Sequence, residues 1–388
     1  MSKPDVIQSS FQKWKIWTAI FLGISVAGFM LYRSLSETRF VKVAEGTGTH
    51  KWIDSNQNGV IDFSQVADFK KEPGGNYKIE TLSDVLVSIS WTEKTFFWIF
   101  IALLCMVGRD FFYMWRIRLL TNHQLTWNKS FSVIMLWEFA SALSPGVVGG
   151  AAVAMFILNR EKIALGRSTA IVIITTMMDN LFYVMMIPLT FLFISSSDLF
   201  PHSYSGSQAI QVVFWTGYSV IAAAAMLLFV ALFIWPTFSK KFLGGIFSLP
   251  ILKRWKSKAI QTGDDIIITS KEMKKETFLS WLKLFLVTCG SWISRYLVIN
   301  AILQAFLDLT LNDHMLILGK QFVLWLFMLV SPTPGASGVA EYAFGELLIS
   351  FSGSTILLAG MAVIWRLISY FPYLFIGAWI LPRFLRKK

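Results

Sequence analysis

Six long apolar runs restrict the fold of this chain more strongly than any other feature of the sequence. Each is close to or above the roughly 20 residues that a helix needs to cross a bilayer. They cover residues 16–32, 95–115, 168–194, 210–235, 279–306 and 355–381. The whole chain is 55% hydrophobic and 15% charged, whereas soluble domains are roughly 45–50% apolar and about 25% charged. We therefore predict an all-α polytopic membrane protein with about six full transmembrane helices.

The first run follows Lys13 and Lys15 and invites comparison with a secretory signal. A signal has an apolar region of about 7–15 residues that ends at a small-residue cleavage site. The run at 16–32 is longer and has no clear site of that kind. We expect it to be a retained first span.

Two further apolar segments, 130–158 and 315–350, are interrupted near their middle by proline and glycine. The interruptions read Ser144-Pro145-Gly146-Val147-Val148-Gly149-Gly150 and Ser331-Pro332-Thr333-Pro334-Gly335-Ala336-Ser337-Gly338. Proline removes a backbone donor and glycine frees the chain to turn, so each segment should be two short helices joined by a break. Such a break is tolerated at membrane depth only where protein or water satisfies its backbone.

The net charge, 35 − 23 = +12, would suggest nucleic acid in a soluble chain. Here the Lys and Arg residues cluster in loops, as expected for loops on the cytoplasmic side, so no nucleic-acid partner is implied. Ranges 195–209 and 308–314 contain neither residue type and are predicted to lie outside. We predict a multi-pass protein of the cytoplasmic (inner) cell membrane with both termini inside.

These orientations predict a domain order and two hairpins of opposite polarity. The regions are 1–32 (tail and first span), 33–94 (extracytoplasmic loop), 95–235 (first membrane repeat with hairpin 130–158), 236–278 (basic cytoplasmic loop) and 279–388 (second repeat with hairpin 315–350). Pro145 precedes Asp179 by 34 positions, and Pro332 precedes Arg366 by 34; the second interval is 32 when the Pro-Gly pairs are aligned. An inverted repeat with re-entrant hairpins and two unrelated kinks both fit this pattern.

The hairpin residues carry a family resemblance. The first segment is the run from Pro145 to Gly150 with Asn159-Arg160-Glu161. The second is the run Pro334-Gly335-Ala336-Ser337-Gly338-Val339-Ala340-Glu341 with Trp365-Arg366-Leu367. The two segments resemble two signatures of the lysylphosphatidylglycerol synthase transmembrane (flippase-like) family. The resemblance covers roughly residues 80–380. It implies a membrane domain that in some relatives moves an aminoacylated phospholipid between leaflets.

The same resemblance also limits which properties of the family are expected for this chain. The chain stops just after its last span, so the soluble aminoacyl-transfer domain of the full-length synthases, and with it synthase activity, is not expected. Many relatives carry a Glu-Arg pair shortly before the aspartate that follows the first hairpin. This chain has Thr176-Met177-Met178-Asp179 there, so lipid specificity is not carried over.

Ionisable side chains inside apolar runs are costly and mark functional sites by default. The candidates that could bind substrate are Glu138, Asp179, Arg295, Glu341 and Arg366, together with Pro145, Gly146, Gly149, Gly150, Pro334 and Gly335 at the breaks. In one interpretation the arginines hold a lipid phosphate while the acids accept a cationic or hydroxylated headgroup. In the other, the acids and arginines pair with one another and only hold the bundle together. For Arg109 and Asp110 we favour a structural role, by snorkelling or an ion pair.

Residues 54–65 resemble an EF-hand loop. Its ligands would be Asp54, Asn56, Asn58, the carbonyl of Val60, Asp62 and Gln65. Gln65 replaces the usual bidentate glutamate, which predicts weak calcium binding at about 10⁻⁴–10⁻³ M at best. An Asx-rich turn without metal explains the same residues.

The basic loop 236–278 is predicted either to form short helices on anionic phospholipid headgroups or to be a solvated connector. Asp264-Asp265 within it is a weak signal for a metal–sugar site. The sequence contains no nucleotide-binding loop, catalytic triad or zinc motif, so we expect no enzyme activity, no required cofactor and no ATP-driven step. The preferred function is flippase-like transport of a polar-headed lipid, downhill or driven by an ion gradient. The alternatives are a lipid-modifying enzyme or accessory subunit, and a calcium-responsive scaffold.

Overall fold

The computed structural model describes residues 40–55, 61, 63, 65–89, 91–144, 148–200, 207–235, 237, 240–241, 244–245, 247–248, 256–273, 276–331 and 333–386, with isolated positions before residue 40. The predicted span at 16–32 falls almost entirely outside these residues.

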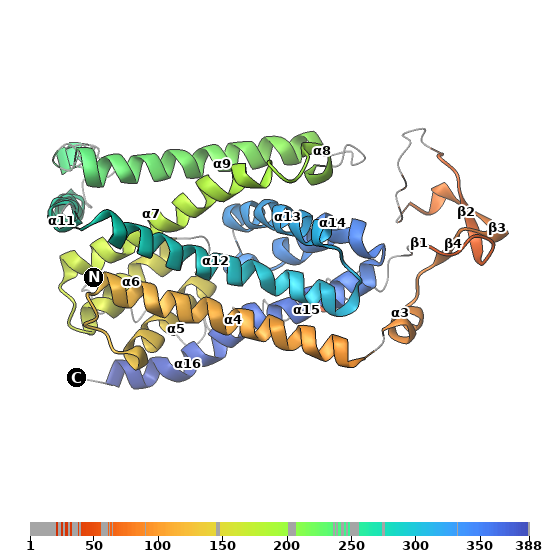
Figure 1. Cartoon of the computed structure of the whole chain (residues 1–388), viewed down its shortest axis with the longest axis horizontal. Coiled ribbons are helices and arrows are strands. Elements are labelled where there is room, and N and C mark those ends of the chain that lie inside the picture. Colours follow the sequence, from red (N-terminus) through yellow and green to blue (C-terminus); the bar gives the residue numbers. More distant parts are fainter. Residues whose placement is uncertain are drawn as a thin grey trace.

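Long apolar helices form the body of the molecule and run side by side along its longest axis (Figure 1). Five helices among the described residues are long and apolar enough to cross a membrane. They are α4 (Glu93–Leu120), α7 (Leu165–Thr190), α9 (Ser207–Phe229), α12 (Phe278–Phe306), and α15 (Thr355–Ser369) continued by α16 (Phe371–Arg386). The predicted all-α polytopic membrane class is confirmed.

The tightest helix pair is α4 with α12, which pack along most of their length. Small residues allow this approach: Gly108 faces Ser294, and a Cβ on Gly290 would come within 2.8 Å of the Phe112 ring. Elsewhere on α4, Phe96 and Phe100 are exposed, as expected for a surface in contact with lipid. Each helix therefore divides its apolar residues between the core of the bundle and the bilayer.

Each Pro/Gly-interrupted segment forms two helices that pack against each other. The first contains α5 (Trp127–Leu143) and α6 (Val148–Arg160), and the second contains α13 (Leu311–Val330), the short η4 (Pro334–Ala336) and α14 (Val339–Ser352). Figure 1 places the α5–α6 pair toward the end of the bundle that holds the C-terminus and the α13–α14 pair toward the other end. The predicted breaks are confirmed; re-entry into the membrane and the inverted repeat stay predictions.

Two predicted boundaries differ from the structure. The predicted span 95–115 ends just before Arg116, but α4 continues to Leu120 and buries Arg116 inside the bundle. The last predicted span bends at Tyr370, where the backbone leaves the helical region between α15 and α16. Both differences change which side chains meet in the core.

The polar stretch before α4 folds into a small antiparallel sheet that the sequence analysis did not predict. Its strands, in the order β1-β4-β2-β3, are β1 (Phe40–Lys42), β4 (Tyr77–Ile79), β2 (Gly48–Trp52) and β3 (Phe69–Gly75). Phe40 stacks on Phe69 with ring centroids 4.0 Å apart, and Tyr77 completes the core. The one-turn η1 (Val66–Asp68) precedes β3, and α3 (Leu82–Ser88) connects the sheet to α4.

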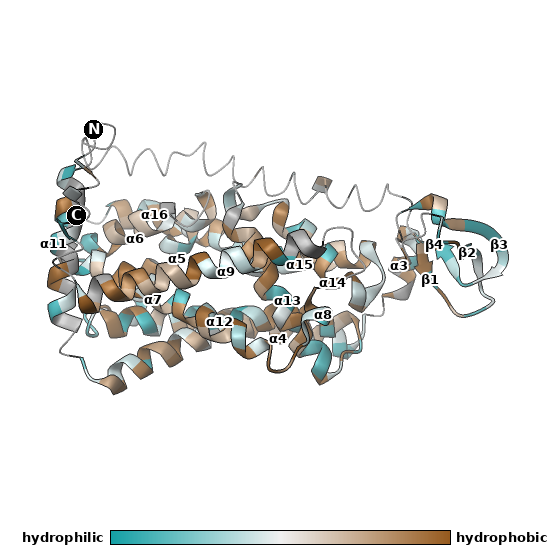
Figure 2. Ribbon diagram, turned by 90° about the horizontal axis from the view of Figure 1, so that it is seen from above, coloured by the Kyte–Doolittle hydropathy of each residue, from teal (hydrophilic) through white to brown (hydrophobic). Residues whose placement is uncertain are grey.

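Three further elements lie among the described residues. The four-residue α8 (Ser196–Leu199) follows α7, and the π-helical turn η2 (Val230–Ile234) ends α9. Helix α11 (Lys256–Met273) packs against α7 and runs across the bundle axis at the end near the C-terminus (Figure 2). Lys240 pairs with Asp264 of this helix at 2.5 Å.

Candidate functional site

A buried arginine on α4 contacts two acidic side chains and a tyrosine. Arg109 lies 2.9 Å from Asp110 through Nη1 and 2.9 Å from Glu138 of α5 through Nη2. The Arg109 Nη1 group also donates to the hydroxyl of Tyr373 on α16 at 2.5 Å, and that hydroxyl donates to Asp110 at 2.7 Å. The arginine side chain is 1% exposed, whereas each of its two acids keeps 21% exposure. Three helices are thus joined by one guanidinium.

A second ion pair lies two turns further along α4. Arg116 Nη1 donates to Asp179 Oδ1 of α7 at 2.5 Å, and the indole Nε1 of Trp292 on α12 donates to the same oxygen at 2.8 Å. Arg116 is 4% exposed and Asp179 is 21% exposed. Asp179 therefore accepts from two helices, in an arrangement that satisfies a carboxylate inside the bundle.

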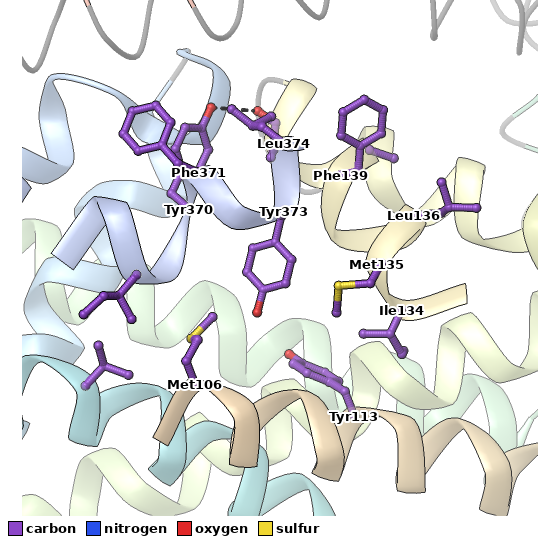
Figure 3. Packing of buried hydrophobic residues seen from close by; sticks show 14 of the residues in the cluster. Met106, Tyr113, Ile134, Met135, Leu136, Phe139, Tyr370, Phe371, Tyr373 and Leu374 are labelled. Atoms are coloured by element: carbon purple, nitrogen blue, oxygen red, sulfur yellow. Dashed lines mark hydrogen bonds between the residues drawn. The ribbon is translucent and has the colours of Figure 1, made fainter. Parts of the chain in front are cut away.

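Tyr113 lies between the two arginines and connects the clusters. Its ring centroid is 4.5 Å from the guanidinium carbon of Arg109 and 4.5 Å from that of Arg116. Residues 109, 113 and 116 have the i, i+4, i+7 spacing of one helix face, so α4 presents all three toward α5, α7 and α16. Figure 3 shows Tyr113 and Tyr373 with their hydroxyls pointing toward one another. We call Arg109, Asp110, Tyr113, Arg116, Glu138, Asp179 and Tyr373 the central network.

The central network borders a cavity of about 60 Å³. Its polar lining comes from Tyr113, Arg116, Trp137, Glu138, Thr175 and Asp179. The hydroxyl of Thr175 is buried and has no hydrogen-bond partner among the described residues. A cavity of this size has room for a few water molecules.

Glu341 and Arg366 form a separate pair at the second hairpin. Arg366 Nε donates to Glu341 Oε1 at 2.7 Å, while Glu341 Oε2 accepts from the backbone N–H of Gly338 at 2.7 Å. The two side chains are only 4% and 6% exposed. The pair closes the first turn of α14 and fastens it to α15, and neither residue lines the cavity.

Tyr370, in the bend between α15 and α16, contacts both the last turn of α5 and the second break. Its hydroxyl donates to the carbonyl of Ala142 in the last turn of α5 at 3.3 Å (Figure 3). Gly335 of the second break has φ = +59°, and a Cβ there would come within 2.2 Å of the Tyr370 ring. Glycine is therefore required at 335, both for its backbone conformation and for the close ring.

The other predicted site residues are placed as follows. Arg295 is half-buried with its guanidinium 5.6 Å from the Trp292 ring centroid, and no carboxylate of the described chain lies within 4.0 Å of it. Gly149 lies in the first turn of α6, and a Cβ on Gly150 would come within 2.1 Å of Ser141 Oγ. Pro334 begins η4. Pro145 and Gly146 lie outside the described residues.

The structure thus separates the predicted charges into different places. Glu138 and Asp179 share the cavity, Glu341 and Arg366 pair with each other, and Arg295 stands beside Trp292. The sequence analysis missed the partners Arg116, Tyr113, Tyr373 and Trp292, although the helical spacing of 109, 113 and 116 is readable in the sequence. The expected ion pair of Arg109 with Asp110 is confirmed, whereas snorkelling is wrong because Arg109 is enclosed.

A buried lysine was also missed. Lys320 of α13 donates to the carbonyl of Leu347 at 2.8 Å and to Ser350 Oγ at 2.9 Å, both on α14. Its ammonium is 5.1 Å from the centroid of the Phe351 ring. The side chain therefore ties the two helices of the second hairpin together.

The calcium-like loop is only partly described. Asp54 and Gln65 lie within the described residues, while Asn56, Asn58, Val60 and Asp62 lie outside them. Ser55 donates to the fully buried Asp68, which follows the loop. Within the described part of the chain no three His, Cys, Asp or Glu side chains are grouped to hold a metal ion. Calcium binding stays a prediction.

A helical membrane bundle with paired charges in its core defines the class as a polytopic integral membrane protein. Residues 79–377 match the model of the lysylphosphatidylglycerol synthase transmembrane region. The chain belongs to this family. It is also similar to a protein named UPF0104 membrane protein from Archaeoglobus fulgidus, with 24% identity over 302 residues, covering 72% of this chain and 85% of the relative. No solved structure matches the chain.

Proposed function

We propose that this protein is a flippase-like transporter that moves a polar-headed lipid between the leaflets of the cell membrane. The observation that carries the proposal is the central network beside a polar cavity, inside a bundle that also contains two Pro/Gly-broken helix pairs. Membrane proteins keep charged side chains inside their helical bundle mainly along substrate and ion pathways. Family membership supports the same function.

Different residues are suited to bind different parts of the lipid headgroup. Of the two arginines expected to hold phosphate, Arg295 is the one with no carboxylate of the described chain within ion-pair distance, and its planar donors suit phosphate oxygens. Glu138 and Asp179 line the cavity and could accept an amine or a hydroxyl of the headgroup. Arg366, which we expected to hold phosphate as well, is occupied by Glu341.

The cavity must widen during transport. Its volume of about 60 Å³ is well below the roughly 300–1,000 Å³ of ordinary ligand pockets. Movement of one broken helix pair relative to the rest of the bundle would enlarge it, and such rocking about a central site is the common mechanism of transporters with broken helices. Tyr370, which contacts the last turn of α5 and Gly335 of the second break, connects the two broken helix pairs.

Reconstitution into liposomes tests the proposal. Purified protein should speed the movement of fluorescent phospholipids across the bilayer relative to protein-free vesicles, measured by the fraction of label that an impermeant quencher reaches. Arg116→Gln should lower the rate about tenfold or more, since it disconnects Asp179 from α4. Lys51→Gln is the control because Lys51 pairs with Glu72 at the surface of the sheet. Equal rates with and without protein, for zwitterionic, anionic and aminoacylated headgroups, would contradict the proposal.

We also propose that both termini face the cytoplasm and that the loop 236–278 contacts anionic lipid headgroups, because basic residues cluster at those parts of the chain. Single cysteines placed at residues 50 and 388 of a variant lacking Cys105 and Cys289 would test the orientation. A membrane-impermeant thiol reagent added to intact cells should label only position 50. Labelling at 388 alone would show the opposite orientation.

A further inference from the structure

Three aromatic rings form a platform on the outer surface of α4, beside α5 and α12. The rings of Trp115 and Phe111 on α4 have centroids 6.0 Å apart, and the Phe111 ring stacks on that of Trp127 of α5 at 5.4 Å. Phe111 and Trp127 are both exposed. We call Phe111, Trp115 and Trp127 the aromatic platform. None of the three lines the cavity of the central network, so the platform is a separate feature of the bundle.

A cation stands at each end of the aromatic platform. The guanidinium carbon of Arg118 lies 4.3 Å from the ring centroid of Trp127, and the ammonium of Lys283 on α12 lies 5.8 Å from that of Trp115. Arg118 Nε donates to the carbonyl of Leu125 at 3.1 Å, whereas its two Nη groups donate to no residue of the described chain. The guanidinium is therefore held by a carbonyl and a ring while its outer donors stay open.

Neither of these cations has an acidic partner. Among the described residues no carboxylate lies within 4.0 Å of Arg118 or Lys283. Lys129, in the first turn of α5, differs from them because it pairs with Glu161 at 3.1 Å. Two positive charges at the platform are thus left for a negative group from outside the chain.

The two cations lie at the same level of the bundle. Helices α4 and α12 run antiparallel, with Gly290 of α12 beside Phe112 of α4. Arg118 is six residues after Phe112, and Lys283 is seven residues before Gly290. At 1.5 Å per residue both are displaced by about 10 Å toward the same end of the bundle, which is the end that holds the C-terminus (Figure 1). One anionic group can therefore face both.

Next to the platform, α4 carries a stripe of exposed apolar side chains. Phe100, Leu104 and Val107 precede Phe111 at helical spacings of three or four residues, and all four are exposed. Arg118 follows Phe111 by seven residues and shares this face. From Phe111 to Phe100 the helix rises about 16 Å, which is about half of the roughly 30 Å hydrocarbon core. The stripe therefore matches the length of an acyl chain in one leaflet.

We infer that the aromatic platform and its two cations form a binding site for a phospholipid whose headgroup carries a net negative charge. The Nη groups of Arg118 and the ammonium of Lys283 donate to the phosphate oxygens, while the ring faces hold both cations in place. The acyl chain lies along the exposed stripe of α4. A zwitterionic headgroup binds less well, because no carboxylate is present to accept its cationic part. The site faces the bilayer, whereas the central network faces inward, so the inference is independent of the proposed transport.

Thermal unfolding of the full chain in neutral detergent tests the site. A ligand that binds only the folded state raises the unfolding temperature as its concentration increases. Short-chain phosphatidylglycerol should do so for the wild type, and phosphatidylcholine should do so far less. Arg118→Gln and, separately, Lys283→Gln should weaken phosphatidylglycerol binding about tenfold or more. Lys283 makes no hydrogen bond within the described chain, so its variant should fold even where Arg118→Gln does not.

Lys129→Gln is the matched control, because it removes an exposed lysine at the same end of the bundle. It should bind phosphatidylglycerol as the wild type does. Equal weakening in Lys129→Gln and Lys283→Gln would show general attraction to a basic surface and overturn the site. Equal stabilisation by the two lipids would overturn its selectivity for a negative headgroup. Inorganic phosphate that stabilises the wild type as much as phosphatidylglycerol would overturn the lipid as its occupant.

A photoreactive phosphatidylglycerol locates the bound lipid directly. With the reactive group in its acyl chain, it should label the segment 100–111 of α4 in the wild type, and Lys283→Gln should reduce that label about tenfold. Labelling confined to other segments of the chain would overturn the inference.

Discussion

The bundle contains two sets of buried charges, and they are built differently. The Glu341–Arg366 pair has equal numbers of acids and bases, is nearly inaccessible, and caps the helix that it belongs to. The central network has three acids for two bases, keeps 21% exposure at each acid and borders a polar cavity. Balanced and enclosed charges fasten helices together, whereas unbalanced and accessible charges can bind something that arrives from outside. The difference separates a structural contact from a candidate site.

The largest expected effect is the loss of one partner from the enclosed pair. Glu341→Ala would leave Arg366 buried without a counter-charge and remove the acceptor of the Gly338 N–H, at a cost of about 3–5 kcal/mol in the free energy of unfolding. Thermal unfolding in detergent, followed by loss of a monodisperse peak in size-exclusion chromatography, measures it. The double variant Glu341→Met with Arg366→Met should recover much of the loss. A Glu341→Ala protein as stable as wild type would remove the structural role of this pair.

Gly335 tests the contact between the second break and Tyr370. Gly335→Ala places a Cβ at a residue with φ = +59° and against the Tyr370 ring, which should cost about 1–3 kcal/mol of stability. Gly345, in α14, is the matched control, since a Cβ there meets nothing within 4 Å. Gly345→Ala should stabilise the helix by about 0.5–1 kcal/mol. Equal unfolding temperatures for the two variants would contradict the close approach of Tyr370.

Glu138 should behave in the opposite way to Glu341. Glu138→Gln removes the excess charge of the central network while Asp110 still compensates Arg109, so the free energy of unfolding should change by less than about 1 kcal/mol or rise. The same thermal assay applies, with both acid variants compared side by side. Similar destabilisation by Glu138→Gln and Glu341→Ala would contradict the claim that the two sets of charges have different roles.

The smallest effect is expected outside the bundle, at Asp84 of α3. Hydrogen bonds from Thr81 and then Lys78 lower the pKa of this carboxyl below its ordinary value of 3.8. A lowered folded-state pKa adds stability above the unfolded-state pKa, and this stability is lost as the pH falls through the folded value. The protection factors of the amides at 82–88 against hydrogen exchange should therefore fall below about pH 4 in the wild type. Asp84→Asn should show no such step, and an identical pH response would contradict the capping contact.

The helices and their two breaks could be predicted because long apolar runs and Pro/Gly clusters act locally. Glu138 and Asp179 could be identified as buried acids for the same reason. Their partners could not: Arg109 and Arg116 stand near the end of an apolar run and look like charges at the membrane surface. Tyr373 comes from a helix 264 positions away from Arg109. The sheet at residues 40–79 was missed because its strands are three to seven residues long and rich in lysine.

The most direct test of the central network as the working site is the rate at which Glu138→Gln moves labelled lipid in liposomes, normalised to folded protein. The account predicts a rate at least about tenfold below wild type, with an unchanged unfolding temperature and with Lys51→Gln as active as wild type. A Glu138→Gln protein that is folded and moves lipid at the wild-type rate would contradict it.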